Sequence, residues 1–156
     1  MSNFNKTREF HQFTGLPDYD HGEHKNWIQD KPLCDFRLKL IEEEVNELKD
    51  AINNKDTNEV IDALSDILYV VYGTGASFGI DLDKTFDIVH KSNMSKMCKT
   101  EKEAQDSVLW YKVNRSDRYD TPTYRTSIVG GKTVWIVYNE SDGKILKSIN
   151  WKPPVF

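Results

Sequence analysis

The chain has 156 residues and a formal net charge of −4, with 38% hydrophobic and 29% charged side chains. A chain of this length fits one domain that can bury a sizeable core without metal or disulfide support. The negative charge disfavours a protein that binds duplex nucleic acid, because such binding needs a concentrated basic surface. We therefore expect no nucleic-acid polymer among the partners, and an anionic ligand would need bound cations or nearby lysines.

The cysteines and the N-terminal sequence indicate the cellular compartment. Cys34 and Cys98 lie far apart and form no C-x-x-C pair, so neither a thiolate zinc site nor a disulfide framework is indicated. The first residues lack a basic segment followed by an apolar run, and no stretch approaches the roughly 18 apolar residues of a membrane span. These features predict a soluble, cytoplasmic protein with no membrane partner.

Hydrophobic periodicity predicts helices over the first half of the chain. Residues 2–14 form a short amphipathic pattern, and residues 18–31 are polar and rich in turn formers. Apolar residues then recur at helical spacing from Pro32 to about Asn53, with the proline suited to a first helical turn. A broadly apolar helix follows up to Gly79, opened by a capping box that starts at Asp56.

The second half changes from helix to strand. A third long helix is predicted over 81–96, and a capping box at Thr100 opens a shorter one. Residues 133–138 are β-branched and aromatic, and residues 144–148 follow a turn, so these two segments are predicted to pair as a hairpin. We expect a mainly α fold, an antiparallel helical bundle with a small C-terminal β-hairpin, in a single domain over 1–156 with a helical core at about 32–114 and a hairpin and tail at about 124–156.

Two carboxylate clusters stand out on the predicted long helices. Glu43 and Glu44 lie four and three residues before Glu47, so all three share one helical edge within roughly 100°. Asp62 and Asp66 lie one turn apart on the next helix, which a short connection makes an antiparallel neighbour. Like charges so placed repel one another unless a cation lies between them. The pattern predicts a metal site between the two helices.

Two other interpretations of these carboxylates stay open. The glutamates could form a solvated helix face, as most glutamate-rich helical stretches do. The aspartates could belong to a buried network with lysine or arginine. Asp62 and Asp66 favour the metal site, because they alternate with apolar residues on a helix predicted to be buried over most of its circumference. All-oxygen ligands favour Mg²⁺, with Mn²⁺ possible, and these ions bind polyphosphates readily.

The chain resembles the all-α nucleoside triphosphate pyrophosphohydrolase superfamily, in its MazG-like and phosphoribosyl-ATP-pyrophosphohydrolase-like branch. The resemblance covers most of the chain and rests on an ordered series of motifs. These are Phe10-His11-x-Phe13-x-Gly15-Leu16-Pro17, Leu40-Ile-Glu-Glu43-Glu44-Val-Asn-Glu47-Leu48, Asp62-Ala-Leu-Ser-Asp66-Ile-Leu-Tyr69-Val, Gly79-Ile-Asp81, Ser92-Asn93-Met-Ser-Lys96 and Asp142-Gly-Lys-Ile-Leu-Lys147.

The resemblance implies a helical enzyme that forms a homodimer or homotetramer. It implies Mg²⁺-dependent hydrolysis of a nucleoside triphosphate between its α and β phosphates, giving a monophosphate and pyrophosphate. Glu43, Glu44, Glu47 and Asp66 match the family's metal-binding carboxylates, one of which is expected to orient or deprotonate the attacking water. The catalytic candidates are Glu43, Glu44 and Lys96, and the substrate-binding candidates are Asn93, Lys96, Lys144, Lys147 and His11.

Several of these positions carry alternatives. The family's second motif is usually Glu-x-x-Asp, but Ala63 stands three residues before Asp66, which leaves Asp62 as the substitute ligand and the number of metals open. His11 could contact substrate or pack in the core. Lys144 and Lys147 are predicted on one basic strand face that either contacts phosphate or is solvated. The chain could instead be a non-catalytic module that senses nucleotides or binds a protein, or a structural dimer with a salt-bridged core.

Overall fold

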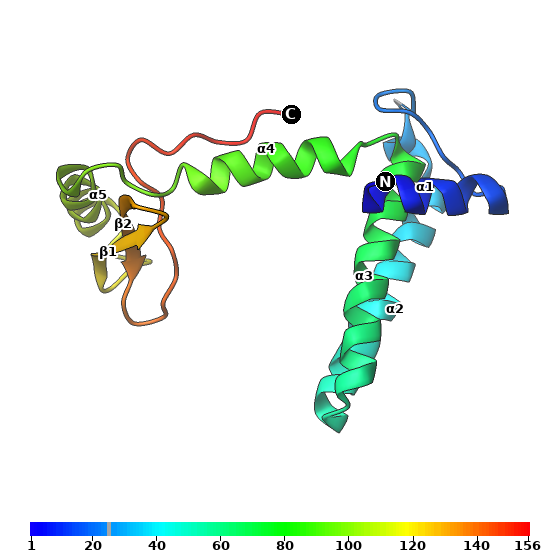
Figure 1. Cartoon of the computed structure of the whole chain (residues 1–156), viewed down its shortest axis with the longest axis horizontal. Coiled ribbons are helices and arrows are strands. Elements are labelled where there is room, and N and C mark those ends of the chain that lie inside the picture. The colour runs from blue at the N-terminus through cyan, green and yellow to red at the C-terminus, as the bar shows by residue number, and fades with distance from the viewer. Residues whose placement is uncertain (25) are drawn as a thin grey trace. The chain divides into compact units, whose positions relative to one another are not determined.

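The computed structural model describes residues 1–24 and 26–156 and is mainly α-helical (Figure 1). Its contacts divide the chain into two compact units, Met1–Thr85 and Phe86–Phe156, which are treated separately below. The predicted fold class is confirmed, since helices dominate and a two-stranded antiparallel sheet lies near the C-terminus. Within the described residues, no single helix is both long enough and apolar enough to cross a membrane.

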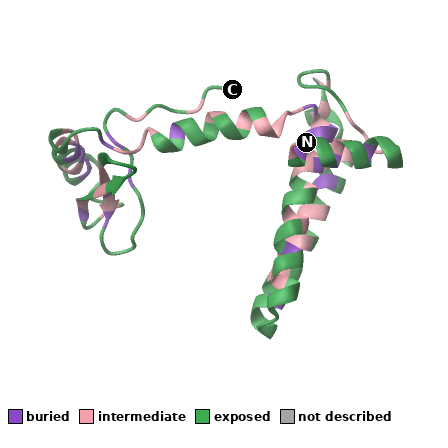
Figure 2. Ribbon diagram, in the orientation of Figure 1, coloured by how far each residue is buried: buried purple, intermediate pink, exposed green. Residues whose placement is uncertain are grey.

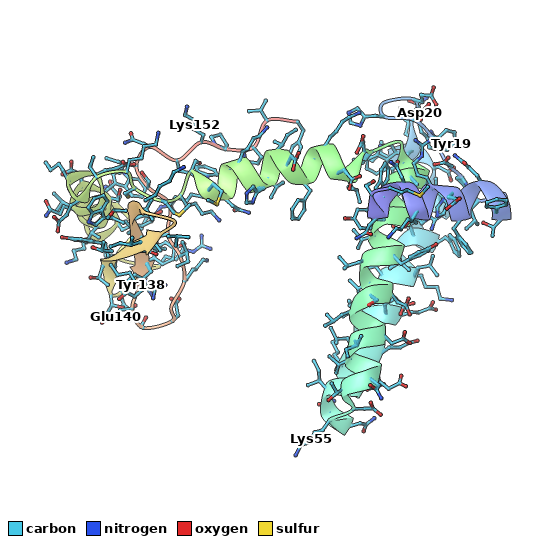
Figure 3. The ribbon with its side chains drawn as sticks, viewed as in Figure 1. Tyr19, Asp20, Lys55, Tyr138, Glu140 and Lys152 are labelled. Atoms are coloured by element: carbon cyan, nitrogen blue, oxygen red, sulfur yellow. The ribbon has the colours of Figure 1, made fainter. Side chains whose placement is uncertain are left out.

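The first unit is built on a pair of long antiparallel helices, α2 (Lys31–Asn54) and α3 (Thr57–Phe78). Asp30 starts α2 by accepting a hydrogen bond from the backbone N–H of Leu33, 3.1 Å away. Lys55, in the left-handed conformation at φ 57°, ends it. Asp56 then caps α3, so only two residues separate the helices and they must fold back on each other. Figure 3 marks this turn at Lys55.

Helix α1 (Asn3–Thr14) packs against α3 through aromatic side chains. The rings of Phe10 and Tyr69 meet edge to face with centroids 5.8 Å apart, and the rings of Phe4 and Tyr72 are tilted by 44° with centroids 6.2 Å apart. A short 3-10 helix, η1 (Trp27–Gln29), precedes α2. Figure 2 shows that buried positions gather around the end of α3 nearest α1, while most of the hairpin's outer surface is exposed.

The second unit holds most of α4 (Leu82–Met94), then α5 (Glu101–Asn114) and the strands β1 (Pro122–Val129) and β2 (Lys132–Asn139). The strands pair from Pro122 with Asn139 to Val129 with Lys132. Two glycines with positive φ, 57° and 75°, form the tight turn between them. The unit's small core has five buried members, which are Cys98 after α4, Ala104 and Tyr111 on α5, Val137 on β2, and Leu146 in the segment after β2.

The predicted hairpin is present, but one of its strands was assigned wrongly. The partner of β2 is β1, whereas residues 144–148 form no strand and touch β2 at one isolated bridge, Tyr138 with Ile145. The reason is that residues 122–129 are mostly polar, with Arg125, Thr126 and Ser127 in the middle, so no strand was predicted there. Lys144 and Lys147 therefore do not share a strand face, which corrects the predicted basic surface there.

Candidate metal and nucleotide site

The five predicted carboxylates converge around Glu44, at the middle of the α2–α3 pair. The pKa of Glu44 is raised, first because burial disfavours the charged form and then because Glu47, Asp66, Glu43 and Asp62 add negative charge around it. Its Oε2 atom is buried and has no hydrogen-bond partner. The α2 edge and the α3 aspartates thus surround one carboxylate that has no compensating donor.

Positive charge near this group is sparse. Lys39 lies one turn before Glu43, with Nζ 3.4 Å from Oε1, and both side chains are well exposed. Such a surface pair stabilises little. No other member of the group has a lysine or arginine within ion-pair distance among residues 1–24 and 26–156. The salt-bridged network considered from the sequence is therefore not found in the described structure.

The carboxylates are more exposed than the sequence pattern predicted. Glu43, Glu47 and Asp62 are exposed, while Glu44 and Asp66 are half-buried. The prediction that α3 buries most of its circumference is wrong, because α1 and α2 cover it on one side only. Exposed apolar side chains remain on it, with 60% of Ile61, 49% of Leu64 and 56% of Leu68 accessible.

The two candidate positions of the second motif, Asp62 and Ala63, differ in exposure. Ala63 is only 3% exposed, whereas its neighbour Asp62 is exposed. A helical step of one residue turns a side chain by about 100°, so Asp62 points along a different edge of α3 from position 63. In the described residues, no three His, Cys, Asp or Glu side chains are already spaced as a metal coordination shell. The group is an open acidic surface around Glu44 rather than a closed cage.

His11 lies in the core, two turns along the hairpin from the carboxylates. It is 2% exposed, and its Nδ1 lies 2.7 Å from the carbonyl oxygen of Pro17. Burial lowers the pKa of His11, against the opposing effect of that carbonyl, and the charge of Arg37 lowers it further. The packed alternative is the one observed in this state of the chain.

Arg37 is a residue that the sequence reasoning missed. It is 3% exposed, its Nη2 lies 3.4 Å from His11 Nε2, and its Nε has no hydrogen-bond partner. Burial lowers its pKa, which is the expected effect on a cation without a counter-charge. A signal for it existed, because Arg37 stands two helical turns before Glu44 on the otherwise apolar inner face of α2.

Comparison with known proteins places this hairpin in a family. Residues 8–93, more than half of the chain, match the family model described as Phosphoribosyl-ATP pyrophosphohydrolase. The chain belongs to this family. It is also similar to Uncharacterized protein L479 of Acanthamoeba polyphaga mimivirus, with 27% identity over an alignment 238 positions long, which covers 99% of this chain and 94% of that protein.

Membership of the phosphoribosyl-ATP pyrophosphohydrolase family covers His11, Arg37 and all five carboxylates. It supports a pyrophosphohydrolase that acts on nucleotide-like substrates, as the sequence resemblance implied. The matched region ends at Asn93, an exposed residue in the last turn of α4. Lys96, Lys144 and Lys147 lie beyond the part of the chain that the family match describes.

Those three lysines belong to the second unit of this phosphoribosyl-ATP pyrophosphohydrolase family member. Lys96 is half-buried just after α4, and its carbonyl accepts a hydrogen bond from the N–H of Ser148 at 3.2 Å. The ammonium group of Lys144 lies 5.6 Å from the ring centroid of Tyr119, and that of Lys147 lies 3.3 Å from the ring centroid of Trp151. Lys144 and Lys147 therefore each lie over an aromatic ring of their own unit.

Proposed function

We propose that this chain is a Mg²⁺-dependent nucleoside triphosphate pyrophosphohydrolase, with Mn²⁺ as an alternative metal. Its substrate is a ribo- or deoxyribonucleoside triphosphate, cleaved between the α and β phosphates. The observation that carries the proposal is Glu44, whose buried oxygen has no donor among the described residues and whose pKa is raised by burial and by four neighbouring carboxylates. A divalent cation supplies what this group lacks, and membership of the family makes a phosphoanhydride the matching substrate.

The residues present fit such a metal. Glu43, Glu44, Glu47, Asp62 and Asp66 offer only oxygen donors, which suits Mg²⁺ and Mn²⁺ and disfavours zinc or iron. Four of them lie around the fifth on two helices, so small side-chain movements can bring several oxygens together. A divalent ion held there would neutralise phosphate charge and lower the pKa of a bound water.

The side chains of the chain itself carry the remaining roles. Glu43 and Glu44 are the candidates that orient the attacking water or accept its proton, because they lie on the α2 edge that faces the acidic centre. Asn93, Lys96, Lys144 and Lys147 belong to the second unit and stay substrate-binding candidates on the sequence resemblance alone. The exposed apolar residues Ile61, Leu64 and Leu68 on α3 support assembly as a homodimer or homotetramer.

The experiment is a pyrophosphate-release assay over standard and modified ribo- and deoxyribonucleoside triphosphates. Wild type and Glu47→Gln are compared with Mg²⁺, with Mn²⁺ and with a chelator. Metal-dependent pyrophosphate release that falls at least 100-fold in Glu47→Gln supports the proposal. Metal-dependent nucleotide binding without turnover in wild type refutes it and favours a sensing module instead.

A further inference from the structure

The guanidinium group of Arg37 lies in a pocket of the fold formed by three helices. His11 of α1 contacts it at 3.4 Å, and Gly73 of α3 lies against it, since a Cβ on that glycine would come within 3.2 Å of Arg37 Nη1. The same Cβ would come within 2.9 Å of His11 Nε2. The missing side chain at position 73 therefore makes the room that the histidine and the arginine occupy.

Arg37 has no anionic partner in the described structure. No carboxylate oxygen of residues 1–24 or 26–156 lies within ion-pair distance of it, and its Nε makes no hydrogen bond. Its one close polar neighbour is His11, whose lowered pKa keeps the ring neutral at physiological pH. With Nδ1 donating to the Pro17 carbonyl, Nε2 presents a lone pair to the arginine. A neutral acceptor only partly compensates a buried cation.

Arg37 and Glu44 are spaced so that a single ligand can contact both side chains. Seven residues separate them, so they lie on one face of α2 about 10.5 Å apart along the helix axis. Among the described residues, Arg37 has no anion within ion-pair distance, and Glu44 has neither a cation within that distance nor a donor to its Oε2. A metal-bound polyphosphate carries both missing charges in a single ligand, with the cation at one end of this face and phosphate oxygens toward the other.

We propose that Arg37 is a phosphate-binding residue that holds the pyrophosphate portion of the substrate, and that His11 occupies its place when no phosphate is bound. This assignment rests on the function proposed above. The planar guanidinium group can donate two parallel hydrogen bonds to a phosphate. The imidazole of His11 offers it a single acceptor, Nε2. Because Arg37 is almost completely covered, binding requires His11 and the adjacent part of α1 to move aside.

The test measures binding of inorganic pyrophosphate, without turnover, to the full-length protein by calorimetry and by thermal unfolding in the presence of Mg²⁺. Arg37→Gln removes the charge, and Arg37→Lys keeps a charge but loses the paired donors, which provides a second variant if the first does not fold. Lys49→Gln is the matched control, because Lys49 is exposed on the same helix and, among the described residues, its side chain bonds only to Asn46.

The expected result is a Kd for pyrophosphate at least tenfold weaker in the Arg37 variants than in wild type and Lys49→Gln, while Mg²⁺ alone still raises their unfolding temperature. Equal pyrophosphate affinity in wild type and in a folded Arg37 variant overturns the proposal. Absence of pyrophosphate binding to wild type with Mg²⁺ also overturns it. Arg37-dependent pyrophosphate binding by a wild-type protein that hydrolyses no nucleotide would instead uphold this site and refute the proposed function.

Discussion

Replacing Glu44 by Gln separates the stability of the fold from its metal chemistry. The change keeps the shape of the side chain and removes a charge that lies among four other carboxylates, with one buried oxygen lacking a donor. The amide still leaves a polar atom without a partner, so the gain comes from the lost charge, and repulsion between like charges at a partly exposed site is worth ~1 kcal/mol. Glu44→Gln should therefore stabilise the metal-free protein, raising its Tm by roughly 2–4 °C.

The pH dependence of this gain has a definite sign. Because the pKa of Glu44 is raised in the folded state, ionisation opposes folding at neutral pH. The advantage of Glu44→Gln should be largest above the folded-state pKa and should shrink as the pH falls through it toward the ordinary value of 4.5. Below both values the wild-type carboxyl is protonated in both states and the two proteins should unfold alike.

Adding metal should reverse the order of stability. A ligand at 100 times its Kd stabilises a folded protein by about 2.7 kcal/mol, and wild type should gain most of this while Glu44→Gln gains little. Thermal unfolding with a chelator and with saturating Mg²⁺ measures both effects, with Glu42→Gln as the control because Glu42 is exposed on the same helix. The reasoning is refuted if Glu44→Gln is less stable than wild type without metal, or gains as much from Mg²⁺.

Three further substitutions test the fold around this site. Asp18→Asn should lose about 1–3 kcal/mol of unfolding free energy, because Asp18 accepts hydrogen bonds from α1 that lower its pKa despite burial. This loss should fade as the pH falls below 3.8, the ordinary pKa of an aspartate, and a pH-independent difference would contradict it. Gly73→Ala should destabilise by about 1–3 kcal/mol, because its Cβ would meet His11 at 2.9 Å; a stabilised variant in urea unfolding, as at an open helical site, would show the contact to be absent. Asn139→Ala should cost about 1–3 kcal/mol by leaving the Thr121 N–H without its 3.0 Å acceptor, and an unchanged urea midpoint would count against this.

The helices could be predicted closely because their ends depend on local chemistry. Asp30, Asp56 and Thr100 each accept hydrogen bonds from the backbone of the turn that they open, and Gly79 adopts a positive φ of 64° where α3 ends. The capping boxes were only partly right in detail. The carboxylate of Glu103 accepts from the N–H of Lys99, one residue before the cap, rather than from Thr100 itself.

Strand pairing was less predictable, because the partner of a strand is chosen by contacts distant in sequence. The segment after β2 does pair with it, through the N–H of Leu146 and the carbonyl of Val137 at 2.9 Å, but the pairing does not extend into a strand. The glycine pair before β2 was the stronger hairpin signal, since two residues with positive φ suit the turn that joins twisted strands. A hairpin centred on that turn predicts β1 as the partner of β2.

The candidate site was predictable in its acidic half only. Helical spacing placed Glu44 and Asp66 on facing edges, and the structure surrounds Glu44 with the other carboxylates. The same spacing overstated the burial of Asp66, because periodicity shows which residues are apolar but not whether a single chain can cover them. Arg37 was not predicted, because a lone arginine on a helix face does not by itself indicate a binding site. Its role depends on the absence of a counter-charge in the described structure, which the sequence does not show.

The most direct test of the proposed activity is the product ratio from a nucleoside triphosphate hydrolysed in ¹⁸O-labelled water, followed by ³¹P NMR. The account predicts one pyrophosphate for each monophosphate, with the label in the monophosphate because water attacks the α phosphorus, and no product when Mg²⁺ and Mn²⁺ are removed. Orthophosphate with a nucleoside diphosphate, or pyrophosphate release that persists without metal in Glu47→Gln, would contradict the account.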